Sequence, residues 1–511
     1  MKYDCIIIGA GIGGLTAAAR LAKSGLKVLL AEKFNHAGGT ATVFHREGYS
    51  FPTGPLSFSY PSYVSNTLKE LGIRQEVNFK RSHFQYKSQD MDLILSYPFN
   101  QLAGELRNFF PQEGKGICSF FEVMKKLIDA QDRRWEWDTD LLEGRKKEDA
   151  LKNPVKDIGK RVAIIKEYLE VSAENLADEF IRNPLLRCLL ANQSFDEGAM
   201  SALLASQAWN LMSEAGIWYP DAGFEGLNNL ITKAIHENNG EIRFSSPVAQ
   251  ILVEKNRAKG ISLESGENIY SDIIVSSLDY KLTFLEMIGE SFFQSDFVKW
   301  VKNLKDSGSV FCVYLGVDSS KVDLSVFKAE HIFYRARSES ITSWDDGISS
   351  KDFFMNREYE ICHWSGKDKS LVPPGKDALI IRVNAPYQYF KKWLYGKEVR
   401  GKGYYGYKRT AAKYLIEAAE TVIPGLSSAV EVMDASTPLT YRTWGGGSEG
   451  ACAGWSWDNT DEMGSTMKSL VRTPIPNLYM AGYQAFSQLF MGGFATAMHS
   501  GNLVAGLILE G

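Results

Sequence analysis

The first forty residues constrain the fold most, because they read without a break as strand, glycine loop, helix and second strand. Residues 4–8 form an apolar run that is too short to cross a membrane and suits a buried parallel strand. The run leads directly into a G-x-G-x-x-G motif at residues 9–14. Its first glycine allows a tight turn, the second admits a pyrophosphate close to the backbone, and the third lets helix and strand pack closely. These three positions are Gly9, Gly11 and Gly14, and Gly13 lies between the last two.

The residues after the loop complete a dinucleotide-binding unit. Small apolar residues at helical spacing predict a helix that ends near Gly25, and phosphates would lie at its N-terminus. A second strand at residues 27–31 ends in Glu32, where a carboxylate normally holds a ribose hydroxyl. Up to this point the pattern fits FAD and NAD equally well.

A pair of glycines, Gly38 and Gly39, follows the acid in the sequence EKFNHAGGT. With this addition the chain resembles the glutathione-reductase-type FAD fold, in the branch of amine oxidases, carotenoid desaturases, carotenoid isomerases and retinol saturases. The resemblance implies FAD as the cofactor, held noncovalently. It also implies an α/β architecture, in which a Rossmann-like three-layer FAD domain is joined to a discontinuous α+β substrate domain.

The resemblance covers most of residues 1–75, 220–280 and 435–511, which are expected to form the FAD domain in three parts. Residues 76–219 and 281–434 would then form the substrate domain in two parts. Beyond the glycines already named, it implies flavin contacts for Glu32, Lys33, Thr40, Gly54, Pro55, Val248, Gly482, Gly492, Gly493 and Phe494. A helix that starts near residue 491 would direct its amides at the flavin. Many members carry an acid soon after Gly482 to bind ribitol, and Gln484 would replace it here.

Outside these segments the sequence predicts elements and no activity. Helices are expected at residues 227–237 and 404–420, and strands at 241–244, 248–254 and 310–315. A further helix carries an apolar face made of Ile117, Phe120, Phe121, Met124 and Leu127. Core packing is the default interpretation of this face, and the alternative is a tunnel wall or a surface that dips into a membrane. The charged segment 143–161 is expected to be solvated.

Composition excludes several classes of function. With 57 Lys and Arg against 61 Asp and Glu, the net charge is −4, so no basic field recruits nucleic acid. No signal-peptide cleavage site and no apolar stretch of membrane-spanning length is present, so we expect a cytoplasmic protein that can associate with a membrane. The six cysteines include no C-x-x-C pair, and the seven histidines form no ligand grouping, so no metal site is expected. The sequence leaves the oligomeric state open.

Three functions remain in competition. The first is an FAD-dependent oxidoreductase that desaturates, saturates or isomerises an apolar polyene or prenyl chain delivered from a membrane surface. The chemistry needs no protein nucleophile. Tyr441, Arg442 and His363 are candidate polar neighbours of the flavin ring, but an ordinary structural hydrogen bond is the default interpretation of each, so no catalytic residue is assigned.

The second function is an amine or amino-acid oxidase, which should show a pair of aromatic side chains and a charged anchor in the substrate domain. Candidate aromatics are Trp344, Trp364, Trp393 and Trp455, and Cys452 resembles the cysteine that carries flavin covalently in some amine oxidases. The third function is a non-catalytic prenyl-binding escort protein. It ranks last, because such proteins are degenerate at the flavin glycines and Gly11, Gly39 and Gly493 are intact here.

Overall fold

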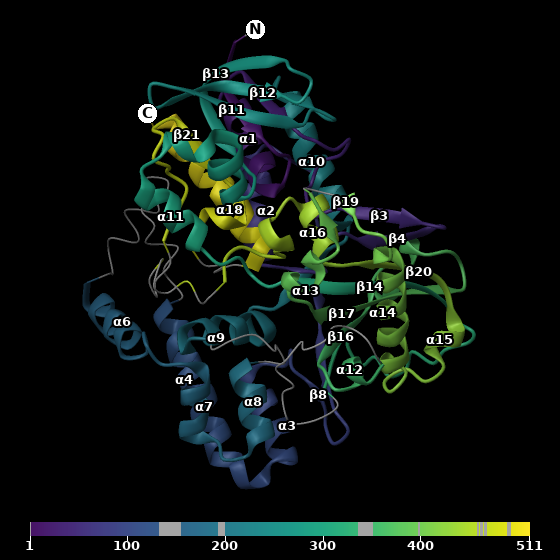
Figure 1. Cartoon of the computed structure of the whole chain (residues 1–511). Helices are drawn as coiled ribbons and strands as arrows, with labels where there is room; N and C mark the ends of the chain where they lie inside the picture. Colours follow the sequence, from purple (N-terminus) through teal and green to yellow (C-terminus); the bar gives the residue numbers. More distant parts are fainter. Residues whose placement is uncertain are drawn as a thin grey trace.

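The computed structural model describes residues 2–131, 155–192, 200–335, 351–396, 399–456, 459, 463, 468–487 and 492–510. Within these ranges the chain forms two seven-stranded sheets and a lobe of helices (Figure 1). Trp344, Met491 and residues 143–154 of the charged segment lie outside the described residues.

The first sheet has the strand order β10-β2-β1-β13-β12-β11, and β21 pairs with β13. The strands are β1 (Lys2–Ile8), β2 (Val28–Ala31), β10 (Glu241–Arg243), β11 (Val248–Glu254), β12 (Arg257–Leu263), β13 (Asn268–Ser276) and β21 (Leu478–Met480). Strands β10, β2, β1, β13 and β21 are parallel, and β12 and β11 continue the sheet antiparallel. The predicted apolar strand at residues 4–8 is central in this sheet, so residues 5–8 are buried on both faces.

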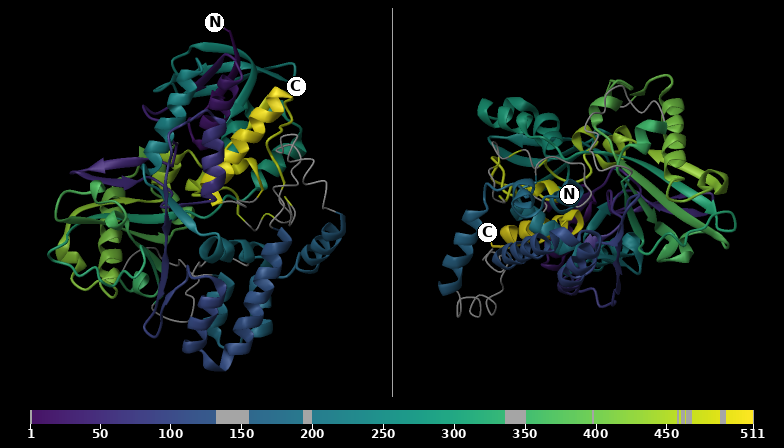
Figure 2. Two further views of the ribbon diagram at one scale, coloured as in Figure 1. Left: turned by 180° about the vertical axis from the view of Figure 1, so that it is seen from behind. Right: turned by 90° about the horizontal axis from the view of Figure 1, so that it is seen from below.

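Helix α1 (Ile12–Lys23) packs between two other helices beside the first sheet. It contacts both α10 (Gly223–Glu237) and α18 (Gly492–Leu509), and the three lie side by side in Figures 1 and 2. The crossing of α1 and α18 is close, because a Cβ at Gly501 would lie 2.4 Å from the carbonyl oxygen of Gly13. The predicted helix over residues 227–237 is confirmed as α10, which begins at Gly223.

The second sheet has the order β20-β14-β17-β16-β15-β7-β8. Its strands are β7 (Phe84–Lys87), β8 (Asp92–Ile94), β14 (Val310–Asp318), β15 (His331–Tyr334), β16 (Tyr359–His363), β17 (Lys376–Asn384) and β20 (Val430–Ser436). All neighbours are antiparallel except β15 and β7. Helices α14 (Tyr404–Ala419) and α15 (Leu426–Ala429) accompany this sheet at the right of Figure 1.

The two faces of the second sheet belong to different cores, because side chains alternate along a strand. Phe311 and Val313 of β14 pack in one core with residues of α14. Cys312 and Tyr314, on the opposite face, belong to the core that also contains the first sheet. We call this second face, which includes Cys312, Tyr314, Ile380 and Cys362, the inner face.

The apolar helix face predicted from the sequence belongs to a lobe of helices, which lies at the bottom of Figure 1. The lobe contains α3 (Phe99–Phe109), α4 (Gly114–Gln131), α6 (Val155–Glu167), α7 (Ala173–Phe180), α8 (Pro184–Asn192) and α9 (Ala202–Trp209). The five apolar residues from Ile117 to Leu127 lie on α4 and are all buried in the lobe's own core. Core packing is therefore confirmed for this face, and the alternative of a membrane-dipping surface is wrong.

Short elements link these parts. A hairpin of β3 (Val43–Arg46) and β4 (Tyr49–Pro52) contacts the inner face, where Phe44 and Phe51 pack on Tyr314 at ring distances of 5.0 and 5.7 Å. A small sheet has the order β5-β9-β6. The remaining elements used below are β5 (Phe58–Ser59), β6 (Phe79–Ser82), β9 (Ile217–Pro220), α2 (Pro61–Glu70), α11 (Ser295–Asn303), β18 (Leu394–Tyr395), β19 (Val399–Arg400) and α16 (Pro438–Gly445).

The strands of the first sheet come from residues 2–31, 241–276 and 478–480, and those of the second sheet from residues 84–94, 310–384 and 430–436. Strand β20 thus runs two residues past the boundary expected at 434/435. The five-part division of the chain into domains stays a prediction.

Candidate functional site

The glycine loop connects β1 to α1 and leaves open space at only one of its motif glycines. Gly9 has a φ of +94°, which favours glycine. A Cβ on Gly14 would lie 2.1 Å from the carbonyl oxygen of Gly9, and one on Gly13 would lie 2.5 Å from the amide nitrogen of Gly482, so both are needed for packing. Among the described residues, a Cβ on Gly11 would meet nothing nearer than the Ser277 hydroxyl at 3.9 Å. The backbone at Gly11 therefore borders an open space at the N-terminus of α1, where a phosphate fits.

Glu32 ends β2 beside this loop. Its buried carboxylate accepts hydrogen bonds from the backbone N–H of Ala10 at 2.7 Å and of Phe34 at 3.0 Å. The backbone N–H of Ser246 donates to the carbonyl of Glu32 at 2.8 Å, which brings Val248, the first residue of β11, close to this acid. Lys33 is exposed and donates from Nζ to the carbonyl of Thr443 at 3.1 Å.

The paired glycines form a second wall against the first loop. Gly38 donates its N–H to the carbonyl of Ala10 at 2.8 Å, and a Cβ on Gly39 would lie 3.2 Å from the Cα of Gly11. Their φ values of +114° and +60° explain why glycine occupies both positions. A Cβ on Gly54 would lie 2.6 Å from the carbonyl oxygen of Thr40, so the corner that precedes Pro55 touches the same wall.

The N-terminus of α18 completes the group of predicted residues. Gly492 has a φ of +69°, and a Cβ on Gly493 would meet no atom of the described residues within 4 Å, so with respect to these residues the helix end also borders open space. Phe494 is buried against Phe58 and Phe224, with ring distances of 5.5 Å to each. The backbone N–H of Gly482 donates to the hydroxyl of Ser500 on α18 at 2.7 Å, which ties the end of β21 to this helix.

The structure therefore gathers the predicted residues at the carboxyl ends of the parallel strands β1, β2, β13 and β21. This edge is where open α/β sheets bind their ligands. The two open spaces, at Gly11 and at Gly493, both lie at helix N-termini, which suit the negative charge of a dinucleotide. By this test the residues present fit a bound FAD.

Gln484 is a correction to the sequence analysis. Its Oε1 accepts from the backbone N–H of Tyr280 at 2.7 Å, and its Nε2 donates to Asp279 at 3.2 Å and to Asp306 at 3.0 Å. The expectation that this side chain binds ribitol is not supported, because its polar atoms are turned into this internal cluster.

The cluster around Gln484 contains two acids that the sequence did not reveal. Asp306 pairs with Lys281 at 2.7 Å, and Asp279 accepts from the backbone and hydroxyl of Ser448 at 2.9 and 2.7 Å. Burial and the neighbouring Asp279 raise the pKa of Asp306 to about 7, against the opposing effect of Lys281. The cluster joins the ends of β13 and β21 to the loops at residues 304–309 and 446–452, so it holds the rim of the site.

The inner face of the second sheet carries a charged group that the sequence also did not reveal. Strand register places Cys312, Arg382 and Glu360 side by side on β14, β17 and β16. Glu360 accepts from Nε of Arg382 at 2.8 Å and lies 2.6 Å from Nδ1 of His331. Only the alternation of β-strand side chains could have indicated that these residues share a face.

Two of the three candidate ring neighbours can be placed. Tyr441 of α16 lies against the inner face, where its hydroxyl donates to Cys312 Sγ at 3.1 Å. His363 points away from the inner face and its Nε2 lies 2.7 Å from Asp377 Oδ1, which agrees with the default interpretation of an ordinary structural hydrogen bond. Arg442 lies in the last turn of α16, and its role stays a prediction.

The three candidate tryptophans in the described part of the chain, Trp364, Trp393 and Trp455, do not pair with one another. Trp364 donates to the carbonyl of Ser50 at 3.0 Å, and Trp455 donates to that of Gln484 at 3.1 Å. Trp393 packs on Tyr407 beside the other core of the second sheet. Each of these side chains thus serves a different part of the structure.

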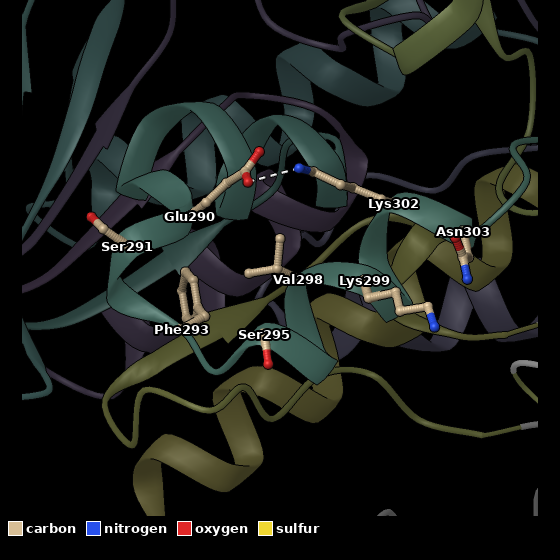
Figure 3. A pocket seen from close by; sticks show the side chains of 8 residues that line it. All are labelled: Glu290, Ser291, Phe293, Ser295, Val298, Lys299, Lys302 and Asn303. Carbon is tan, nitrogen blue, oxygen red and sulfur yellow. Dashed lines mark hydrogen bonds and ion pairs between the residues drawn. The ribbon is translucent and has the colours of Figure 1, made fainter.

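Other surfaces of the described chain offer little chemistry. A surface pocket between Glu290 and α11 contains Phe293, Val298 and an ion pair of Glu290 with Lys302 at 2.7 Å (Figure 3). It includes none of the residues predicted to hold the cofactor. Across the described ranges, no group of three or more His, Cys, Asp or Glu side chains could hold a metal ion. None of the helices found there is long and apolar enough to cross a bilayer.

Comparison with known proteins agrees with this geometry. The family model of flavin containing amine oxidoreductases matches residues 12–357, more than half of the chain. Prolycopene isomerase from Daucus carota is 25% identical over 87% of this chain and 70% of the isomerase. All-trans-retinol 13,14-reductase from Danio rerio is 24% identical over 99% of this chain and 86% of the reductase. The structure of putrescine oxidase bound to putrescine superposes with a TM-score of 0.59 at 14% identity over 100% of both chains, which shows the shared fold.

Proposed function

Because the chain belongs to the flavin-containing amine oxidoreductase family and is an FAD-dependent oxidoreductase, we propose that it acts on the C–C or C=C bonds of an apolar polyene or prenyl chain. The reaction is a desaturation, a saturation or a flavin-assisted isomerisation. The observation that carries the proposal is an apolar path of aromatic rings. Phe494 packs on Phe224 at 5.5 Å, Phe224 on Tyr219 at 5.7 Å, and Tyr219 on Trp364 at 5.3 Å.

This path connects the N-terminus of α18 with the second sheet. Trp364 belongs to the same core as Cys362 and Tyr314 of the inner face. A wall of this kind can bind a long hydrocarbon without a charged group, since burial of each methylene contributes about 0.8 kcal/mol. The two curated relatives are named for reactions on prolycopene and retinol, and both names describe polyenes.

When bound, FAD supplies hydride transfer at its isoalloxazine ring. The chain's residues hold and orient the cofactor. We propose that the amides around Gly11 and at the start of α18 bind its phosphates and ring, and that Glu32 binds its ribose. The proposed contacts also include Lys33, Thr40, Pro55 and Val248. The buried aromatic path excludes water from the reacting bond.

We propose that FAD is held noncovalently. Burial raises the pKa of the Cys452 thiol to about 12, so the thiolate that would attack a flavin is scarce at neutral pH. Acid precipitation of the holoprotein should leave the yellow colour in the supernatant, and colour that stays in the pellet would show a covalent bond.

The substrate is almost insoluble in water, so we propose that the protein contacts a membrane surface to obtain it. Two exposed apolar side chains suit such a contact better than the buried face of α4. Tyr395 and Val399 face each other across β18 and β19, with 63% and 67% of their surface exposed. Wild-type protein should float with liposomes, and Tyr395→Asp should float less; equal flotation of both would exclude this surface.

Product analysis tests the reaction. Oxidised and chemically reduced holoprotein would be incubated without oxygen with retinol or a carotene in liposomes, and separately with putrescine, and the products separated by chromatography. We expect a changed polyene and no bleaching of the flavin by the amine. If the amine bleaches the flavin and both forms leave every polyene unchanged, the amine-oxidase alternative replaces this proposal. The absence of a bound-flavin spectrum would instead favour an escort protein.

A further inference from the structure

An arginine in the second sheet lies among buried neighbours and still reaches accessible space. On the inner face, Arg382 is flanked by Cys312 and Glu360 across the strands, and both flanking side chains are buried. The side chain of Glu360 is 6% exposed, whereas that of Arg382 is 30% exposed. Since β17 is an interior strand of the sheet, the guanidinium must border an open space above the inner face.

The contacts of Arg382 show which part of the guanidinium faces that space. Its Nε and Nη2 both donate to the same oxygen of Glu360. Its Nη1 donates to no atom of the described residues. One edge of the fork is thus fixed by Glu360, and the Nη1 end remains for a ligand.

Glu360 is held as an anion that orients the arginine. Although burial alone would raise it, Arg382 and His331 hold the pKa of Glu360 at about 2, and burial lowers the pKa of His331. At neutral pH the acid is therefore ionised and the imidazole is neutral. A paired and buried carboxylate of this kind fixes the guanidinium in one orientation.

A second cation leaves this region with positive charge in excess. Lys367 donates to the hydroxyl of Ser82 and lies 5.7 Å from the centre of the Tyr219 ring, on the aromatic path described above. It forms no ion pair within the described residues. Lys80 and Glu330 also act on Lys367 and offset each other in charge. Arg382 and Lys367 therefore still outnumber Glu360, and the field favours a bound anion over a bound cation.

We propose that Arg382 binds a carboxylate of the substrate, and that the preferred substrate is an apolar chain that ends in this group. The inference rests on the proposed function for the apolar part of the molecule. Arginine presents a planar fork that matches the geometry of a carboxylate. An amine, which the amine-oxidase alternative would require, is disfavoured beside the same two cations. An amino acid also carries a carboxylate, and the test below distinguishes it from a long apolar acid.

The test measures binding to the FAD-loaded protein with probes that differ only at the end group. The dissociation constants of all-trans-retinoic acid, all-trans-retinol and leucine would be determined by quenching of protein fluorescence. We expect wild type to bind retinoic acid more tightly than retinol. Arg382→Met should weaken the binding of retinoic acid by about 10- to 100-fold and leave the binding of retinol almost unchanged. Arg382→Lys keeps the positive charge and loses the planar fork, so its affinity for retinoic acid should lie between those of wild type and Arg382→Met.

Two further variants keep the result interpretable. Because Arg382→Met leaves Glu360 buried without its partner, the double variant Arg382→Met with Glu360→Gln removes both charges and should show the same selective loss. Arg243→Met is the matched control, since Arg243 is 32% exposed and pairs with Glu241 at 2.7 Å on the first sheet. This control should bind both retinoids as wild type does.

Each contrary outcome identifies what has failed. If wild type binds the acid and the alcohol equally and Arg382→Met changes neither, the inference is wrong while the proposed function stands. If wild type binds neither retinoid and the product assay leaves retinol and carotene unchanged, the proposed function itself fails; if it binds neither retinoid but converts a carotene, only the inference is wrong. If leucine binds in a way that requires Arg382 and retinoic acid does not bind, the proposal of a long apolar acid is wrong and the substrate is an amino acid.

Discussion

Replacement of Gly11 by alanine should abolish FAD binding and leave the apoprotein stable. Gly11 is the N-cap of α1 with a φ of −68° and a ψ of 168°, a conformation that any residue adopts. The added Cβ would meet no atom of the described residues nearer than 3.9 Å. It would instead project into the space where we place the pyrophosphate, which requires the closest approach of the backbone.

The expected magnitudes follow from these two observations. Replacement of glycine by alanine at a compatible position stabilises the folded protein by about 0.4–1 kcal/mol, because it reduces the conformational entropy of the unfolded chain. Alanine is also a poorer N-cap than glycine, which costs a similar amount, so the apoprotein should change by less than about 1 kcal/mol. FAD at one hundred times its dissociation constant should stabilise wild type by about 2.7 kcal/mol, and Gly11→Ala should lose this contribution.

Thermal unfolding of the apoprotein with and without added FAD measures both effects. Wild type should melt at a higher temperature with FAD, and Gly11→Ala should melt at one temperature in both conditions. Gly14→Ala is the control for packing, because its Cβ would lie 2.1 Å from the carbonyl oxygen of Gly9 and should lower the melting temperature of the apoprotein itself. A Gly11→Ala protein that binds FAD with the affinity of wild type would refute the assignment of the pyrophosphate to this loop.

Three further predictions test other parts of the structure. Glu32→Gln should weaken FAD by about 1.5–3 kcal/mol, measured by titration of the apoprotein, because it removes the charge from a buried acceptor; unchanged affinity would contradict its role. Phe121→Asp should destabilise the fold by at least about 3–5 kcal/mol in urea, because it creates a cavity and buries a charge, whereas Phe109→Asp on the half-exposed Phe109 should be almost neutral. The raised pKa of Asp306 means that the folded protein binds a proton that the unfolded chain releases, so stability should fall as the pH rises from about 4 to about 7. Asp306→Asn should reduce the difference between the free energies of unfolding that urea denaturation gives at pH 5 and pH 8. An unchanged difference would show that other groups cause the pH dependence.

Much of the cofactor site could be predicted because its signals are local. The strand at residues 4–8, the glycines and Glu32 lie within one continuous unit, and positive φ values or close backbone contacts restrict Gly9, Gly14 and Gly38 to glycine. Such restrictions act between residues near in sequence, so a short pattern records them. The apolar face of α4 was equally readable as a face, but its burial depended on the other helices of the lobe.

The sequence by itself therefore determined the β1–α1–β2 unit, the acid that ends it and the glycine-rich start of the last helix. Only the tertiary structure decided what surrounds them. Arg382 and Glu360 come from strands separated by a turn and two short helical segments, and His331 comes from a third strand, so their meeting depends on strand register. A slip of one residue would turn each side chain to the opposite face of the sheet. No local pattern records that register, because it is fixed by the packing of two different cores on the two faces of one sheet.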